Sequence, residues 1–129
     1  MSYYIARTVA GPFETVVADV VERLKAQGFG ILSDIDVQAT LKAKLGADMP
    51  PYRILGACNP SFAHQALQIE DKLGVLLPCN VIVRETADRR VEVASVDPVV
   101  SMDRTGNAAL ASTAEEVRRR LASVIEAVA

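Results

Sequence analysis

The chain has 129 residues, of which 50% are hydrophobic and 23% are charged, and its formal net charge is −2. This length and balance predict one globular domain over residues 1–129 and exclude a disordered chain. The weakly acidic charge disfavours a nucleic-acid partner, because proteins that bind nucleic acids usually carry a basic face.

The N-terminal residues predict a strand followed by an amphipathic helix. Residues 3–9 are rich in β-branched and aromatic side chains, which favour a strand. Pro12 suits the first position of a helix, and Gly28 suits its C-terminal end. The hydrophobic side chains between them lie on one stripe of that helix: Phe13, Val16, Val17, Val20, Val21 and Leu24.

The rest of the chain continues this alternation and then adds a hairpin. The predicted strands cover residues 29–37, 52–58, 75–85 and 90–96, and the predicted helices cover residues 38–45 and 59–73. Residues 99–107 are expected to be a connection. A last helix begins either near Asn107 or at a capping box formed by Ser112 and Glu115. Its hydrophobic face consists of Leu110, Ala114, Val117, Leu121, Val124 and Val128.

The order β-α-β-α-β-α-β-β-α predicts an α+β domain with a single mixed sheet of about five strands. The helical connection after residue 58 is expected to make the third and fourth strands parallel. Since the three longer helices carry one hydrophobic stripe each, the helices should pack mainly on one face of the sheet. The other face then needs a cover, and a second copy of the chain in a homodimer is the expected one.

The sequence also predicts a soluble cytoplasmic protein with no membrane partner. The N-terminus lacks the basic and then apolar pattern of a signal peptide. The longest nearly apolar run, residues 74–83, is too short to cross a bilayer. Cysteines in the cytoplasm are expected to be reduced.

The two cysteines of the chain stand in similar surroundings. Residues 55–60 read LGACNP and residues 76–80 read LLPCN, so each cysteine precedes an asparagine and lies near a proline. Further distinctive segments are IDVQATLK (35–42), KLG (44–46), YRILGACNP (52–60), LLPCNVIV (76–83) and Asp97-Pro98.

On these segments the chain resembles the DUF302 (TT1751-like) family of small bacterial and archaeal proteins. The resemblance implies an α+β domain that is often dimeric and has no established activity. The family's signature blocks contain the equivalents of Cys58, Asn59, Pro60, Pro78, Cys79 and Asn80, usually with an acid at the position of Glu70. One departure lies after Asp97-Pro98, where the family usually has more methionines than the single Met102 present here.

Each cysteine has two interpretations. Cys58 lies where a strand ends and a helix begins, and the free N–H groups and dipole there favour a reactive thiolate. Alternatively it is a small buried residue in a corner of the fold. Cys79 follows Pro78 in a predicted strand, so a bulge could direct it into a pocket, or it could simply pack in the core. Their spacing fits neither a zinc finger nor a CxxC pair, and no cofactor is expected.

Several ionisable side chains also have both a functional and a structural interpretation. Glu70 lies within the hydrophobic arc of its helix, so it either faces a cavity as a proton carrier or reaches water at the last turn. His64 is a general base, a metal ligand or a solvated side chain. Asp34 and Asp36 bind a cation or cap the next helix. The basic run at residues 118–120 reads as a solvated face with Glu115–Arg119 and Glu116–Arg120 pairs.

Three functions therefore stay open, and the sequence does not decide whether the protein is an enzyme. The favoured one is a binding module in which a pocket for a small ligand or a soft metal ion is lined by Cys58, Asn59, Cys79, Asn80 and Glu70. The second is a thiol enzyme or redox sensor that uses Cys58. The third is a structural or regulatory dimer without a ligand site. The first requires the segments around Cys58 and Cys79 to meet in space.

Overall fold

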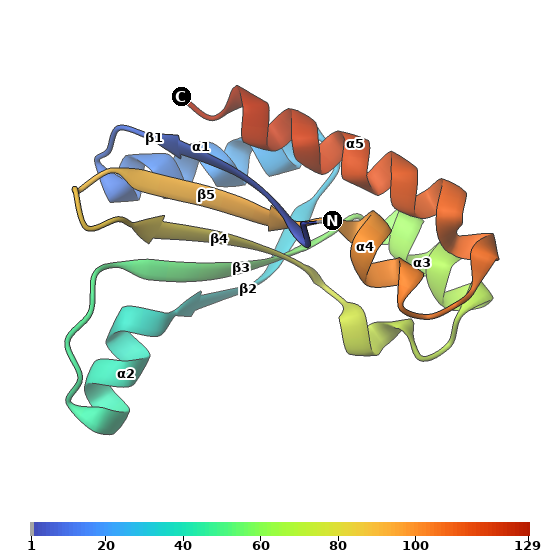
Figure 1. The fold of residues 1–129 in the computed structure, drawn as a ribbon, viewed down its shortest axis with the longest axis horizontal. Coiled ribbons are helices and arrows are strands. Elements are labelled where there is room, and N and C mark those ends of the chain that lie inside the picture. The colour runs from blue at the N-terminus through green and yellow to red at the C-terminus, as the bar shows by residue number, and fades with distance from the viewer. Residues whose placement is uncertain (1) are drawn as a thin grey trace.

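The computed structural model describes residues 2–129, which form one five-stranded sheet with helices around it (Figure 1). The strands are β1 (Tyr4–Val9), β2 (Gly30–Asp36), β3 (Tyr52–Cys58), β4 (Cys79–Glu85) and β5 (Val91–Val96). The helices are α1 (Phe13–Ala26), α2 (Val37–Leu45), α3 (Pro60–Ile69), α4 (Pro98–Asp103) and α5 (Ala111–Ala127), with short 3-10 helices η1 (Leu73–Leu76) and η2 (Ala108–Leu110).

The strand order is β1-β5-β4-β3-β2, and every neighbouring pair is antiparallel. The α+β class and the five strands are confirmed, whereas the mixed sheet is wrong. The prediction failed because α3 and η1 do not cross over the sheet. They form an excursion beyond the end of β3, so β4 starts beside the point where β3 finishes (Figure 1). Ala57 consequently lies directly opposite Cys79.

Local boundaries differ from the predicted ones where proline intervenes. Pro12 is the N-cap of α1 rather than its first residue. Pro78 lies before β4 rather than inside it, and its peptide bond with Leu77 is cis. The expected connection 99–107 contains α4, because Asp97 accepts a hydrogen bond from the Val99 N–H (3.0 Å) and so caps a helix. This is the cap and first-turn chemistry that Asn59 and Pro60 supply for α3.

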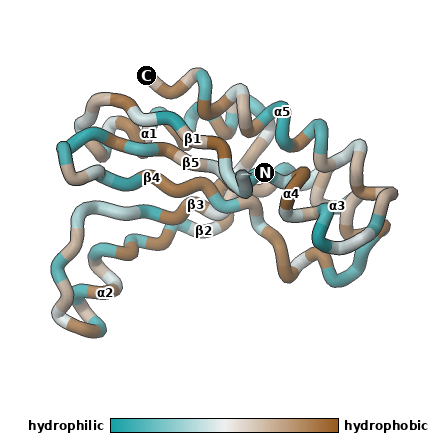
Figure 2. The backbone as a smooth tube through the Cα atoms, in the orientation of Figure 1, coloured by the Kyte–Doolittle hydropathy of each residue, from teal (hydrophilic) through white to brown (hydrophobic). Residues whose placement is uncertain are grey.

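The hydrophobic core lies between the sheet and the pair α1 and α5. The predicted stripes on both helices are confirmed, since Val20 and Leu24 of α1 and Leu121 of α5 are completely buried. They pack against alternate side chains of the central strands, including Leu55, Val81 and Val93. In Figure 2 the inner parts of β3 and β4 are coloured mainly hydrophobic and the β4–β5 hairpin is coloured hydrophilic. No helix among residues 2–129 has the length and hydrophobicity needed to cross a bilayer.

The opposite face of the sheet carries an apolar row across all five strands. In cross-strand register the row consists of Ala6, Ala94, Ile82, Ile54 and Ile35. The Ile35 residue is 46% exposed, and helix α2, which follows β2, has no buried residue and adds no packed layer. The row is therefore the surface through which we predict the homodimer.

Ile82→Glu is the variant that tests this dimer. A carboxylate without a partner in the middle of an apolar interface costs several kcal/mol, so we expect the dimer dissociation constant to rise by about 100-fold or more. Thr8→Glu, on the edge strand of the same face, is the control and should change it little. Sedimentation equilibrium measures both. A wild-type chain that is monomeric at high concentration would remove the dimer prediction.

Candidate functional site

The two cysteine segments meet at one end of the sheet. The Asn59 side chain accepts a hydrogen bond from the Phe62 N–H (3.3 Å), and Pro60 occupies the first position of α3, so the chain turns from strand to helix directly after Cys58. On the neighbouring strand Cys79 is the first residue of β4 and pairs with Ala57. Cys58 and Cys79 thus lie on adjacent antiparallel strands, one residue out of direct register.

A cavity of about 310 Å³ opens at this place, and we call it the thiol cavity. Its wall comes from Phe29 and β2, from the end of β3, from α3, from the segment between α3 and β4, from the start of β4, from α4 and from α5. None of its lining side chains is charged. The lining residues are Phe29, Leu32, Ala57, Cys58, Asn59, Phe62, Ala63, Ala66, Leu67, Gly74, Leu77, Pro78, Cys79, Met102, Thr113 and Val117.

The two thiols differ in their surroundings. Cys58 is half-buried, Cys79 is only 7% exposed, and both are free. Burial, and to a smaller degree the neighbouring Cys58 thiolate, raise the pKa of the Cys79 thiol to about 11. Cys79 therefore keeps its proton at neutral pH and is a poor nucleophile there.

The structure brings three of the five predicted site residues to the cavity, namely Cys58, Asn59 and Cys79. Asn80 is exposed, because its side chain alternates to the other face of the sheet from Cys79. Glu70 ends α3 and accepts a hydrogen bond from the Asn107 side chain (3.3 Å), away from the cavity lining. That these residues bind a ligand stays a prediction.

The other polar candidates, His64, Asp34 and Asp36, do not line the thiol cavity. His64 is exposed on α3 and does not line the cavity. The Arg53 guanidinium donates two hydrogen bonds to the Asp34 carboxylate, and these bonds lower the pKa of the Asp34 carboxyl. Asp36 caps α2 by accepting a hydrogen bond from the Ala39 N–H (2.9 Å). Within residues 2–129 no three His, Cys, Asp or Glu side chains are grouped so that they could hold a metal ion.

Sequence reasoning missed the contributions of α4 and α5 to the wall. Met102 of α4 and Thr113 and Val117 of α5 line the cavity, although residue 102 was expected in an irregular connection. The Asp97-Pro98 pair carries the same helix-start signal as Asn59-Pro60 and could have identified α4. That α4 packs beside η1 and α5, by contrast, has no local signal.

A second layer of residues holds one side of the cavity in place. The Arg120 guanidinium lies 5.0 Å from the centre of the Phe62 ring and donates a hydrogen bond to the carbonyl of Gln27 (3.1 Å). The predicted Glu116–Arg120 ion pair is confirmed at 3.1 Å, whereas Arg119 pairs with Glu116 rather than with Glu115. The basic run is therefore only partly a solvated face.

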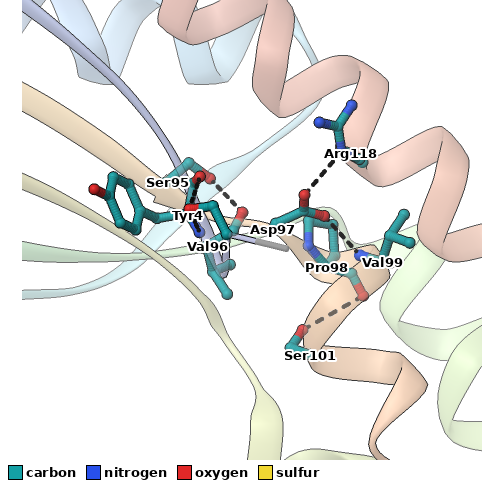
Figure 3. Close-up of polar contacts among 9 residues, drawn as sticks. Tyr4, Ser95, Val96, Asp97, Pro98, Val99, Ser101 and Arg118 are labelled. Atoms are coloured by element: carbon teal, nitrogen blue, oxygen red, sulfur yellow. Dashed lines mark hydrogen bonds and ion pairs between the residues drawn. The ribbon is translucent and has the colours of Figure 1, made fainter.

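Of the three arginines at residues 118–120, Arg118 differs most from the predicted solvated face. Its Nε donates to Asp97 Oδ2 (2.9 Å), and the Asp97 carboxylate is almost completely buried (Figure 3). The other Asp97 oxygen accepts from the Val99 N–H, and the Asp97 N–H donates to the Tyr3 carbonyl (2.8 Å). This pair fixes α4 against α5, and with it the position of Met102 in the cavity wall.

Comparison with known proteins agrees with this fold. The family model described as "Domain of unknown function DUF302" matches residues 5–128. A solved structure, "Crystal structure of uncharacterized conserved protein DUF302 from Bacillus stearothermophilus", shares 25% sequence identity with a TM-score of 0.93, and the match covers 100% of both chains. Among curated proteins no match is found. The resemblance noted in the sequence is confirmed.

Proposed function

The chain belongs to the DUF302 family, and we propose that it is a binding module that holds a small, uncharged and largely apolar molecule in the thiol cavity. The observation that carries this proposal is the cavity itself. Its volume of about 310 Å³ lies at the lower end of the range of small-molecule pockets, roughly 300–1,000 Å³. It is concave, apolar and open, as such pockets are.

The lining determines the character of the ligand. Since no charged side chain reaches the cavity, a charged group buried there would lose its hydration without gaining a partner, at a cost of several kcal/mol. The polar atoms available are the two thiols, the Asn59 amide and the Thr113 hydroxyl. The ligand is therefore neutral and makes few hydrogen bonds. Two exposed leucines on the cavity wall, Leu32 (68%) and Leu67 (38%), offer it an apolar entrance.

Binding is better supported than thiol catalysis. A catalytic cysteine needs a base positioned beside it. In the part of the chain that the structure describes, no histidine, carboxylate, lysine or arginine lines the cavity, and His64 is exposed. The thiols serve here as polarizable parts of an apolar wall.

Ala63→Leu tests the proposal by filling the cavity. Ala63 of α3 lies in the wall and is only partly buried, so the larger side chain extends into the open space without displacing the core. We expect the affinity for a neutral apolar dye such as Nile red to fall by about 10-fold or more, because the added carbons occupy the ligand's volume. Fluorescence titration of the wild-type and variant chains measures this.

Ala39→Leu is the matched control, since Ala39 is exposed on α2, far from the cavity lining. It should bind the dye as the wild type does. The proposal fails if the wild type shows no saturable binding of neutral probes, or if Ala63→Leu binds as tightly as the wild type. Equal affinity for an anionic dye of similar size would contradict the neutral character of the ligand.

A further inference from the structure

A group of exposed hydrophobic side chains adjoins the opening of the thiol cavity. Leu32 (68% exposed) and Leu67 (38%) belong to the cavity lining. Val75 (86%) and Leu76 (39%), both in η1, directly follow another lining residue, Gly74. Exposed hydrophobic side chains are ordinary when they are scattered singly, whereas a contiguous group of them marks a binding surface. We call Leu32, Leu67, Val75 and Leu76 the apolar collar.

An irregularity of β2 sets the position of Leu32 in the collar. The register of β2 on β3 shifts between Ile31 and Ser33, so Leu32 is the additional residue of a β-bulge. Bulges redirect a side chain and are features of the fold rather than defects. A Cβ on Gly56 of β3 would collide with the Ser33 hydroxyl, so the glycine lets the bulged segment lie directly on β3. The backbone therefore holds a large hydrophobic side chain at the opening of the cavity.

The charges next to the collar decide between its possible occupants. Asp71 and Lys72, which precede η1, form an ion pair with each other (3.5 Å), and Glu70 accepts a hydrogen bond from Asn107. An anionic membrane surface attracts clusters of lysine and arginine, and the collar itself is uncharged. A docked protein would cover the collar without filling the cavity. A hydrocarbon chain that starts in the cavity and continues across the collar covers both.

We propose that the ligand of the thiol cavity is a neutral molecule with one long hydrocarbon chain, such as a long-chain alcohol, ester or amide. Its chain fills the cavity and extends over the apolar collar. This inference rests on the proposed function and adds the chemical class of the ligand. The chain removes its own apolar surface and that of the collar from water, so binding strengthens with each methylene that is covered.

The test is a series of primary alkanols from hexanol to tetradecanol, each titrated in competition with Nile red. An apolar cavity of about 150 Å³ holds benzene, so hexanol fits inside a cavity of about 310 Å³, whereas tetradecanol reaches the collar. We expect the affinity of the wild type to rise by about fourfold for each added methylene as far as tetradecanol. A gain that stops at octanol or decanol would overturn the inference, because the collar would then not contact the chain.

Val75→Ser tests the collar itself. Val75 is 86% exposed and lies outside the cavity lining, so its replacement should leave the fold and the binding of hexanol unchanged. The affinity for tetradecanol should fall by about fivefold, because the chain loses apolar contact at the collar. Leu45→Ser is the matched control, since Leu45 is 75% exposed on α2 and outside the lining, and it should bind both alkanols as the wild type does. Undiminished binding of tetradecanol by Val75→Ser contradicts the inference.

The same titrations separate this inference from the proposed function. Binding of Nile red and hexanol without a further gain for longer chains overturns the long-chain ligand and leaves the apolar cavity as a binding site. No saturable binding of any probe by the wild type overturns both. Cosedimentation with phosphatidylcholine vesicles that Val75→Ser abolishes would assign the collar to a bilayer, and a dimer that Val75→Ser weakens would assign it to a second copy of the chain. Either of these results also overturns the inference.

Discussion

Arg118→Met is expected to lower the free energy of unfolding by about 2–3 kcal/mol. The change leaves the buried Asp97 carboxylate without its ion-pair partner, and breaking a fully buried pair in this way costs roughly 3–5 kcal/mol. The Arg118 side chain is 43% exposed, so solvent already screens part of the interaction and the loss is smaller. Urea denaturation followed by circular dichroism measures the difference.

Two further variants give this prediction its control. Arg119→Met removes the neighbouring arginine, whose pair with Glu116 lies at the surface, and should leave the free energy of unfolding nearly unchanged because solvent screens that pair. Asp97→Asn combined with Arg118→Met removes the unpaired carboxylate charge but keeps a side-chain oxygen that caps α4. The double variant should therefore recover part of the free energy of unfolding that Arg118→Met loses. Equal losses for Arg118→Met and Arg119→Met would show that Asp97 does not depend on its partner.

Gly28→Ala is expected to lower the free energy of unfolding by about 2–3 kcal/mol. Gly28 has φ +86°, a left-handed conformation that costs a residue with a Cβ roughly 1–2 kcal/mol. The added Cβ would also lie 2.8 Å from Asn59 Nδ2, so the Asn59 side chain must shift away from the N-terminus of α3. Loss of that cap adds about 1 kcal/mol.

Gly46→Ala isolates the backbone part of this effect. Gly46 also has a positive φ, +67°, but a Cβ there meets no atom within 4 Å. It should therefore show only the conformational cost, about 1–2 kcal/mol. Gly28→Ala should in addition weaken dye binding, since Asn59 and Phe62 line the thiol cavity. If the two variants lose the same stability and bind the dye equally, the contact between Gly28 and Asn59 has no consequence for the site.

The elements that local chemistry governs were predictable. The stripe on α1 recurs at the helical period and faces the core, and Asn59 with Pro60 starts α3 where the sequence indicates. Such signals act within one or two turns, so neighbouring residues contain them completely. The same local chemistry at Asp97-Pro98 starts a helix, α4, where a connection was expected.

The direction of strand pairing was not predictable in this way. A helix between two strands is compatible with a crossover to a parallel neighbour or with an excursion that returns to an antiparallel one. The choice depends on where α3 finds apolar partners. Here Ala66 packs with Leu73, Met102, Leu110 and Ala114 beyond the end of the sheet, so the chain returns beside β3.

The sequence by itself determined the α+β class, the hydrophobic faces of α1 and α5, the Asn59 cap of α3 and the family, because each depends on composition or on neighbours along the chain. Only the tertiary structure decided that Cys58 and Cys79 meet on adjacent antiparallel strands, that Asn80 and Glu70 lie elsewhere, and that Met102 completes the wall. The physical reason is that a cavity forms between segments that are remote in sequence. The local sequence of one segment does not determine which other segments pack beside it or how much space remains between them.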